Sequence, residues 1–296
     1  MLEKTISGGS DPEQVLEEAL SHNVLPAAKA SNGATQGVAP PAAPSPAEAE
    51  GRLAVEPAPA PTAGNGAAAI AATPSTPPLL ALRDVRREPR VKTYIDKANQ
   101  QMAAIGYTEH GHRHAGIVAT IARVILTNLG RDARQTELAA IAGYLHDMGC
   151  VVNRAGHVEA GALMAFQILS DLKVDPAEIG DIVGAIGNHE EPHGLPINPV
   201  AAAVIIADKS DVHFSRVQNP DPAAYDIHDK VNAAVRKSYL HVDAEAKRIR
   251  LELEIDTETA SVMEYFEIFI FRMVMCRKAA EYLGCKFRLS INGRDV

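Results

Sequence analysis

The sequence contains no tryptophan, and its three cysteines form no Cys-x-x-Cys pair. This excludes a disulfide framework and the common zinc-finger patterns, so we expect a reducing, cytoplasmic location. The chain also lacks a surplus of basic residues, because its formal net charge is −8. Such a charge argues against a broad basic surface for duplex nucleic acid, but it is compatible with a small basic pocket for a phosphate.

Long uninterrupted hydrophobic runs are absent as well. The most apolar segment, residues 262–276, contains Glu264, Glu267 and Arg272, so it does not suit a membrane span. The first residues, MLEKTISGGSDPEQ, show no basic segment followed by an apolar one, so we expect no signal peptide. With 46% hydrophobic residues among 296, the chain can bury a sizeable core. We therefore expect a soluble protein without a membrane partner.

The first part of the chain has an unusual composition. Between Pro26 and Leu80, 29 of 55 residues are alanine or proline, and none is aromatic. Such a stretch cannot bury enough apolar surface to offset its ordering entropy. We therefore predict a disordered arm over residues 1–87, which serves as a spacer or tether.

From about residue 88 the pattern becomes a succession of amphipathic helices. Asp132, Asp175-Pro176 and Asn198-Pro199 have the residue types that begin helices. We predict a mainly α fold, with a helical metal-binding domain over residues 88–220 and a small α+β unit over residues 221–296 packed on it. In that unit, residues 248–256 and 287–291 alternate like strands, and a long helix lies between them at about 260–283. The long apolar helix is expected in the core or between two copies of the chain.

A run of polar residues accompanies the helical pattern. Each of five successive helices has an apolar stripe with a histidine or an aspartate at one end. This polar residue either lies three or four residues from the last apolar residue of the stripe, and so on the same face, or follows the stripe directly. The residues concerned are His114, His146, Asp147, His157, His189 and Asp208. Any one of them fits a buried core histidine or a helix cap. Six together would leave many unpaired polar groups in an apolar core unless they bind a metal.

The residue types indicate which metals fit. Imidazole and carboxylate without thiolate suit Mn, Fe, Co, Ni or Zn better than Ca, and the lack of cysteine among the candidate ligands argues against a purely structural zinc site. His114, His146, Asp147 and Asp208 would make one site. With His157 and His189 added, and Asp147 bridging, there would be two divalent ions, which could activate water for attack at phosphorus.

In this order the residues resemble the motif H…HD…D of the HD superfamily of metal-dependent phosphohydrolases. His114, His146-Asp147 and Asp208 take the motif positions, and the resemblance covers about residues 107–217. It implies an HD-domain helical bundle that hydrolyses a phosphate ester. His157 and His189 match the extra histidines of its two-metal branches.

Two branches are especially similar around residues 157–196. HVEAGAL and NHEEPHGLP resemble segments of HD-GYP cyclic di-GMP phosphodiesterases, but Asn188 replaces the first of two histidines and HGLP replaces the GYP signature. The loop from Asp147 to His157 and the segment AIGNHEEP are more similar to the HD domain of ribonuclease Y. Cys150 stands where many HD enzymes carry lysine.

The leading hypothesis is thus a phosphohydrolase, a phosphomonoesterase or phosphodiesterase, that acts on a nucleotide or another small phosphate ester. Asp147 is the residue to which we assign a catalytic as well as a ligating role. The same ligand set also occurs in di-iron oxygenases similar to inositol oxygenase, and a third alternative is a module that senses a nucleotide without turnover. Homo-oligomerisation through the C-terminal unit is a further expectation.

Residues for substrate binding are predicted from helical spacing. Lys209, His213 and Arg216 lie at i, i+4 and i+7, so a continuous helix after Asp208 would present them on one cationic face. A solvated helix face fits the same spacing. The second His-Asp pair, His228-Asp229, lies in a polar segment without accompanying ligands, and we expect no metal there.

Overall fold

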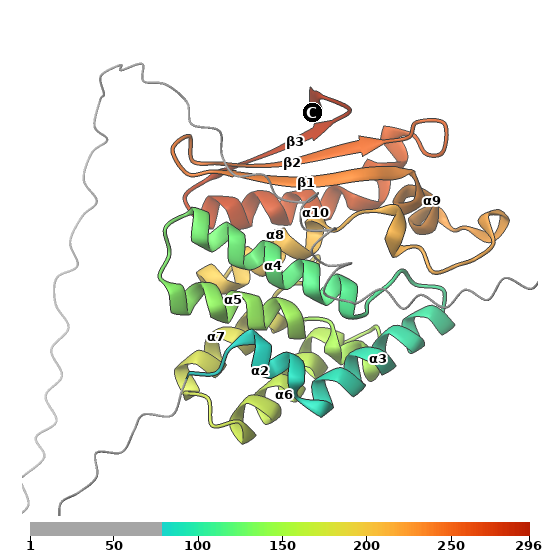
Figure 1. Cartoon of the computed structure of the whole chain (residues 1–296). Helices are drawn as coiled ribbons and strands as arrows, with labels where there is room; N and C mark the ends of the chain where they lie inside the picture. Colours follow the sequence, from blue (N-terminus) through green and yellow to red (C-terminus); the bar gives the residue numbers. More distant parts are fainter. Residues whose placement is uncertain (1–78) are drawn as a thin grey trace, which may run out of the picture. The chain divides into compact units, whose positions relative to one another are not determined.

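The structure is a computed structural model that describes residues 79–296, most of which are helical. The helices that precede the sheet in the chain are α2 (Leu82–Arg87), α3 (Pro89–Ala104), α4 (His112–Asn128), α5 (Ala133–Leu145), α6 (His157–Asp171), α7 (Pro176–Gly187), α8 (Pro199–Ser210) and α9 (Ile227–Ala234) (Figure 1). The expected helix starts are confirmed. Asp132, Asp175 and Asn198 each accept a hydrogen bond from a backbone N–H of the first turn.

Helix α2 corrects the predicted end of the N-terminal arm. Its residues fall inside the range 1–87, yet Leu82 and Val85 are buried in the main hydrophobic core. The apolar residues that follow the Ala/Pro-rich stretch are spaced for one helix face, so the chain begins to pack about six residues before the predicted boundary. The rest of the predicted arm, residues 1–78, lies outside the described residues.

Helix α8 is buried along its length and organises the bundle. Every residue from Val200 to Ser210 is buried, and the helix packs against α4, α5, α7 and α10 (Val262–Tyr282). Alanine is the most frequent residue of this helix, and its small side chain lets neighbouring helices approach closely. Its last turn carries Asp208 and Lys209, which are thereby placed in the interior of the protein.

The C-terminal residues form the predicted strand–helix unit. The sheet has the order β1-β2-β3-β4, with β1 (Val235–Asp243), β2 (Arg248–Ile255), β3 (Lys286–Ile291) and β4 (Arg294–Asp295). Strands β1 and β2 form an antiparallel hairpin, and β2 pairs in parallel with β3 through the crossover helix α10. Helix α10 lies between the sheet and α8 (Figure 1). The C-terminal unit and the helical bundle therefore share one hydrophobic core.

The predicted fold class, a mainly helical bundle with a small C-terminal α+β unit, is confirmed for residues 79–296. Among these residues, no helix is both long enough and apolar enough to cross a membrane.

Candidate metal centre

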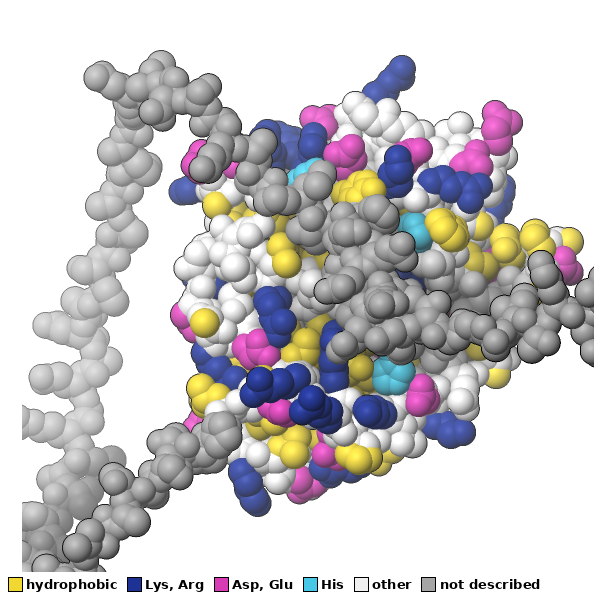
Figure 2. Space-filling model, in the orientation of Figure 1, with side chains coloured by type: hydrophobic (Ala, Val, Ile, Leu, Met, Phe, Trp, Pro, Cys, Tyr) yellow, Lys and Arg dark blue, Asp and Glu magenta, His cyan; other side chains and the backbone are white. Residues whose placement is uncertain are grey.

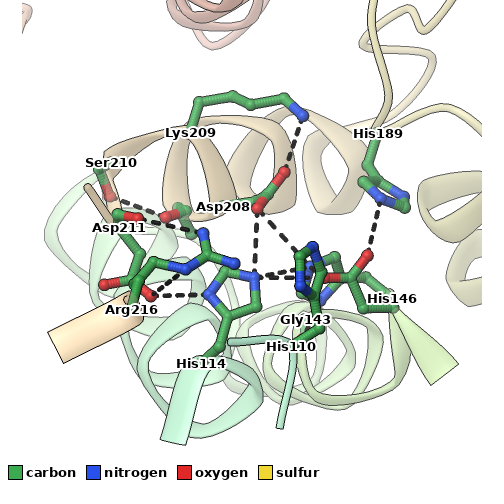
Figure 3. Close-up of polar contacts among 12 residues, drawn as sticks. His110, His114, Gly143, His146, His189, Asp208, Lys209, Ser210, Asp211 and Arg216 are labelled. Carbon is green, nitrogen blue, oxygen red and sulfur yellow. Dashed lines mark hydrogen bonds and ion pairs between the residues drawn. The ribbon is translucent and has the colours of Figure 1, made fainter. Parts of the chain in front are cut away.

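The six residues predicted as ligands meet in the interior, where the ends of five helices converge. Figure 3 labels four of them, namely His114, His146, His189 and Asp208. The contributing positions are the first turn of α4 for His114, the residues directly after α5 for His146 and Asp147, the start of α6 for His157, the second residue after α7 for His189 and the last turn of α8 for Asp208. Each of the six is at most 9% exposed. Such burial of two carboxylates and four imidazoles requires partners for all of them.

The first half of the centre consists of His114, His146 and Asp208 around one oxygen of Asp147. The Nε2 atoms of His114 and His146 lie 3.4 and 3.1 Å from Asp147 Oδ2. They lie 3.3 and 3.6 Å from Asp208 Oδ1. Three side chains and the bridging carboxylate therefore enclose one small volume.

The second half consists of His157 and His189 around the other oxygen of Asp147. Their Nε2 atoms lie 3.4 and 3.6 Å from Asp147 Oδ1. Glu190 Oε2 is 4.0 Å from His157 Nε2, at the edge of this half. The carboxylate of Asp147 thus presents one oxygen to each pair of histidines.

The four imidazoles are oriented by hydrogen bonds on their far sides. His114 Nδ1 donates to Asp211 Oδ2 at 2.7 Å. In each of the other three, Nδ1 lies 2.7–2.9 Å from a backbone carbonyl oxygen, and the pairs are His146 with Gly143, His157 with Arg154 and His189 with Ile186. Because carboxylates and carbonyls only accept, these contacts place a proton on Nδ1 of His114, His146 and His189 and turn Nε2 toward the centre. The Nδ1 atom of His157 also lies 2.7 Å from Arg154 Nη1, which is a donor, so His157 has both a donor and an acceptor on this side.

The Nε2 atoms that face the centre fit a cation. The Nε2 atoms of His114 and His146 are 3.2 Å apart, and so are those of His157 and His189, so each pair needs a proton or a metal ion to offset the repulsion of two facing lone pairs. Burial lowers the pKa of His146, but Asp147 and Asp208 outweigh it and raise the pKa to about 10, so the site attracts positive charge. The donor set therefore fits divalent metal ions, with Asp147 between them.

Gly149 sets the distance between the two halves. It lies in the short 3₁₀ helix Met148–Val151 that follows Asp147, and this turn packs against the start of α6. A Cβ atom at Gly149 would overlap the carbonyl oxygen of His157 and the backbone nitrogen of Gly161. A glycine is required here because α6 must approach closely enough to bring His157 within reach of Asp147.

Cys150 lies beside the second half but suits a ligand poorly. Its Sγ atom lies within 4.8 Å of one ligand atom of Asp147 and one of His157. Burial and the nearby Asp147 carboxylate raise the pKa of the thiol, which keeps it protonated.

A pocket of about 370 Å³ opens over Asp147 and Asp208. Its lining includes five carboxylates, namely Asp147, Glu190, Glu191, Asp208 and Asp226. It also includes four cationic side chains, namely Arg154, Lys209, Arg216 and Arg272. The volume is typical of sites for small molecules.

The residues predicted to form a cationic face behave differently from one another. Helix α8 ends at Ser210, so Lys209, His213 and Arg216 do not continue one helix, and that premise of the prediction was wrong. Lys209 and Arg216 line the pocket. His213 lies on a second pocket, formed with α4 and β1, and its Nε2 faces the backbone oxygen of Arg236.

Asp211 has a larger role than its sequence position indicated. Its carboxylate accepts from His114 Nδ1 and from Arg113, and it is almost fully buried. The Arg113 guanidinium and His114 hold the pKa of Asp211 well below its usual range despite burial. Its position three residues after Asp208, directly after the last residue of α8, is the signal that could have identified it.

The C-terminal unit also reaches the pocket. Ile268, Phe269 and Arg272 of α10 form part of its wall, so this helix serves the site as well as the core. His228 lies at the pocket rim and is exposed, whereas Asp229 is buried near the start of α9. The second His-Asp pair is not part of the cluster of six residues.

Comparisons with known proteins come from the sequence and from the fold. Residues 111–212 match the family model of the HD domain. An uncharacterized protein of Methanocaldococcus jannaschii, MJ1020, is 25% identical over 215 residues, which cover 64% of this chain and 82% of the relative. A crystal structure of a predicted HD superfamily hydrolase from an uncultured Thermotogales bacterium is 22% identical, with a TM-score of 0.34; the match covers 43% of this chain and 68% of that chain. The matched range contains the H…HD…D residues in motif order, so residues 111–212 are similar to the HD domain in both sequence and ligand pattern.

Proposed function

We propose that the protein is a metal-dependent hydrolase of phosphate esters. The observation that carries this proposal is the position of Asp147, whose two oxygens each face one pair of histidine Nε2 atoms. His114, His146 and Asp208 would hold one divalent ion and His157 and His189 a second, with Asp147 shared. Two such ions supply a water of lowered pKa and neutralise charge on phosphoryl oxygens.

The surrounding side chains support this role through their charges. Lys209 Nζ lies 2.8 Å from Asp208 Oδ2, which leaves Oδ1 directed at the histidines. Glu190 is paired with Arg154 and Lys209, so it is an ionised acceptor beside the second half. In this position its carboxylate can orient a water molecule or a substrate hydroxyl group.

The charge of the pocket favours an anionic substrate. Five carboxylates slightly outnumber four Lys and Arg side chains in its lining, so two divalent ions would make the pocket positive. A volume of about 370 Å³ suits a small phosphate ester such as a nucleotide. On the face shown in Figure 2, basic and acidic side chains are interspersed, which agrees with a small substrate rather than a long duplex.

The test combines metal analysis with phosphate release. The protein as isolated is assayed for bound metals and then screened against nucleotides and simple phosphate esters with Mn, Fe, Co, Ni, Zn and Mg. Asp147→Asn should lose bound metal and phosphate release together. Asp229→Asn is the matched control, because it changes the other His-Asp pair and should leave both unchanged.

Three outcomes would contradict the proposal. Full phosphate release by metal-free Asp147→Asn would exclude the metal centre as the site of hydrolysis. Substrate-dependent O₂ uptake without phosphate release would indicate a di-iron oxygenase. Tight nucleotide binding without turnover under any of these metals would indicate a sensing module.

A further inference from the structure

The pocket wall that faces the metal centre is built partly by residues outside the HD domain. Asn232 of α9 and Ile268, Phe269 and Arg272 of α10 line it, whereas the HD domain ends at residue 212. The C-terminal unit thus brings one strongly cationic side chain, Arg272, to the space above Asp208. What this side chain can bind depends on how many of its donors are already used.

The other cationic side chains of the pocket are already paired with carboxylates or backbone oxygens of the protein. Lys209 contacts three carboxylates, those of Asp208, Glu191 and Glu190, at 2.8, 2.7 and 3.4 Å. Arg154 pairs with Glu190. Arg216 donates from Nε and Nη2 to one backbone oxygen and from Nη1 to another.

Arg272 is different in this respect. Its Nε donates to Glu191 Oε1 at 2.9 Å, and its guanidinium lies 4.5 Å from the centroid of the Phe269 ring. Within residues 79–296, its terminal Nη1 and Nη2 groups donate no hydrogen bond, and the side chain is 22% exposed. Glu191 and Phe269 therefore fix the plane of a guanidinium whose outer donors remain free toward the pocket.

We infer that Arg272 is a substrate-binding residue, which holds the phosphate oxygens that face away from the metal centre through Nη1 and Nη2. The inference rests on the proposed function, since it assigns a second contact to the same phosphate. A planar guanidinium fork matches two phosphate oxygens, and Glu191 links Arg272 to Lys209 and thus to Asp208. The C-terminal unit would then complete the active site rather than only cover the bundle.

The experiment measures inorganic phosphate binding to the metal-loaded protein by titration calorimetry. Arg272→Ala should weaken phosphate binding by about 10- to 100-fold, the usual effect of losing hydrogen bonds to a charged group. Arg272→Lys should restore only part of the affinity, because lysine lacks the fork. Arg277→Ala is the control, since Arg277 is exposed on the same helix and does not line the pocket.

A merely structural role for Arg272 makes a different prediction. If Arg272 acts only by holding Glu191, Glu191→Gln would weaken phosphate binding as much as Arg272→Ala does, and this result would overturn the inference. We expect Glu191→Gln to retain most of the affinity. Thermal unfolding and metal content establish that each variant is folded and loaded, and Arg272→Lys carries the test if the alanine variant unfolds.

Failure of this inference can be told apart from failure of the proposed function. Wild-type protein that binds phosphate and hydrolyses esters, with an Arg272→Ala variant that matches it in both, would remove only the role of Arg272. Metal-loaded wild-type protein that neither binds phosphate nor hydrolyses any ester would remove the proposed function and the inference with it.

Discussion

The two halves of the metal centre share Asp147 but differ in what surrounds it. The first half has three further side chains, His114, His146 and Asp208, while the second has His157 and His189. In the first half, a hydrogen bond to the buried carboxylate of Asp211 holds the His114 ring in its orientation. In the second half, His157 and His189 each contact a backbone carbonyl through Nδ1, and His157 Nδ1 also lies 2.7 Å from Arg154 Nη1, so neither has a carboxylate partner on that side.

This difference predicts unequal metal affinities. More ligands and a charged hydrogen-bond partner favour a tightly held ion in the first half. Fewer ligands and an edge open to Glu190 favour an exchangeable ion in the second half, where solvent or substrate completes the coordination. The ion of the first half would then mainly stabilise the packing of the helices, and the ion of the second half would mainly bind the substrate.

Removing one histidine from each half is the strongest test of this division. His146→Ala should cost the protein its tightly bound ion and, with it, phosphate release by about 1000-fold or more, because a metal supplies several kcal/mol of transition-state stabilisation. His189→Ala should keep one ion through dialysis and lose the other. Metal analysis after dialysis distinguishes the two, and equal losses would refute the unequal halves.

The distance between the halves can be altered through Gly149. Gly149→Ala should lower the free energy of unfolding by about 2–4 kcal/mol, because the added methyl overlaps the backbone of α6. Gly180→Ala is the matched control, since Gly180 is exposed in α7 and a Cβ there meets nothing within 4 Å. That variant should be more stable by about 0.5–1 kcal/mol. Denaturant unfolding measures both, and an unaffected Gly149→Ala would contradict the close approach.

The variant Asp211→Asn tests the contribution of the hydrogen bond between Asp211 and His114 to metal binding in the first half. Loss of the carboxylate that accepts from His114 Nδ1 should weaken metal binding in the first half by about 10- to 100-fold. The ion of the second half should be affected less. Competition with a chelator of known affinity measures the change, and a larger effect on the second ion would argue against the assignment of Asp211 to the first half.

The smallest expected effects come from the helix caps. Asp175 caps α7, which ends before His189, and Asp132 caps α5, which ends before His146. Asp175→Ala and Asp132→Ala should each lower the free energy of unfolding by about 1 kcal/mol. If the second half is the looser one, Asp175→Ala should also reduce occupancy of the exchangeable ion, which metal titration would detect, whereas Asp132→Ala should leave the tight ion in place.

Much of the centre could be predicted from the sequence because its geometry follows helical periodicity. A ligand three or four residues from an apolar stripe must face the same interior as the stripe, so His114, His157 and His189 were identifiable without a structure. Helix caps such as Asp132 were equally predictable, because the orphan N–H groups of a first turn need a local acceptor.

The errors arose where periodicity stops. The helix of Asp208 ends at Ser210, and the chain then turns, which separates His213 from Arg216. Arg272 lies more than sixty residues from Asp208 in the sequence, and only the packing of α10 on α8 brings it to the pocket. The early end of the arm was missed because α2 has only one and a half turns, too few for a clear pattern.

The placement of the six donors at helix ends bears on the lifetime of the protein. Helix termini fray before helix centres do, and frayed segments are where proteases cut and where amide protons exchange. Ions that join five such ends would suppress this opening, so chains that fail to acquire metal would be degraded first. At a given rate of synthesis, the amount of protein in the cell would then follow the supply of metal.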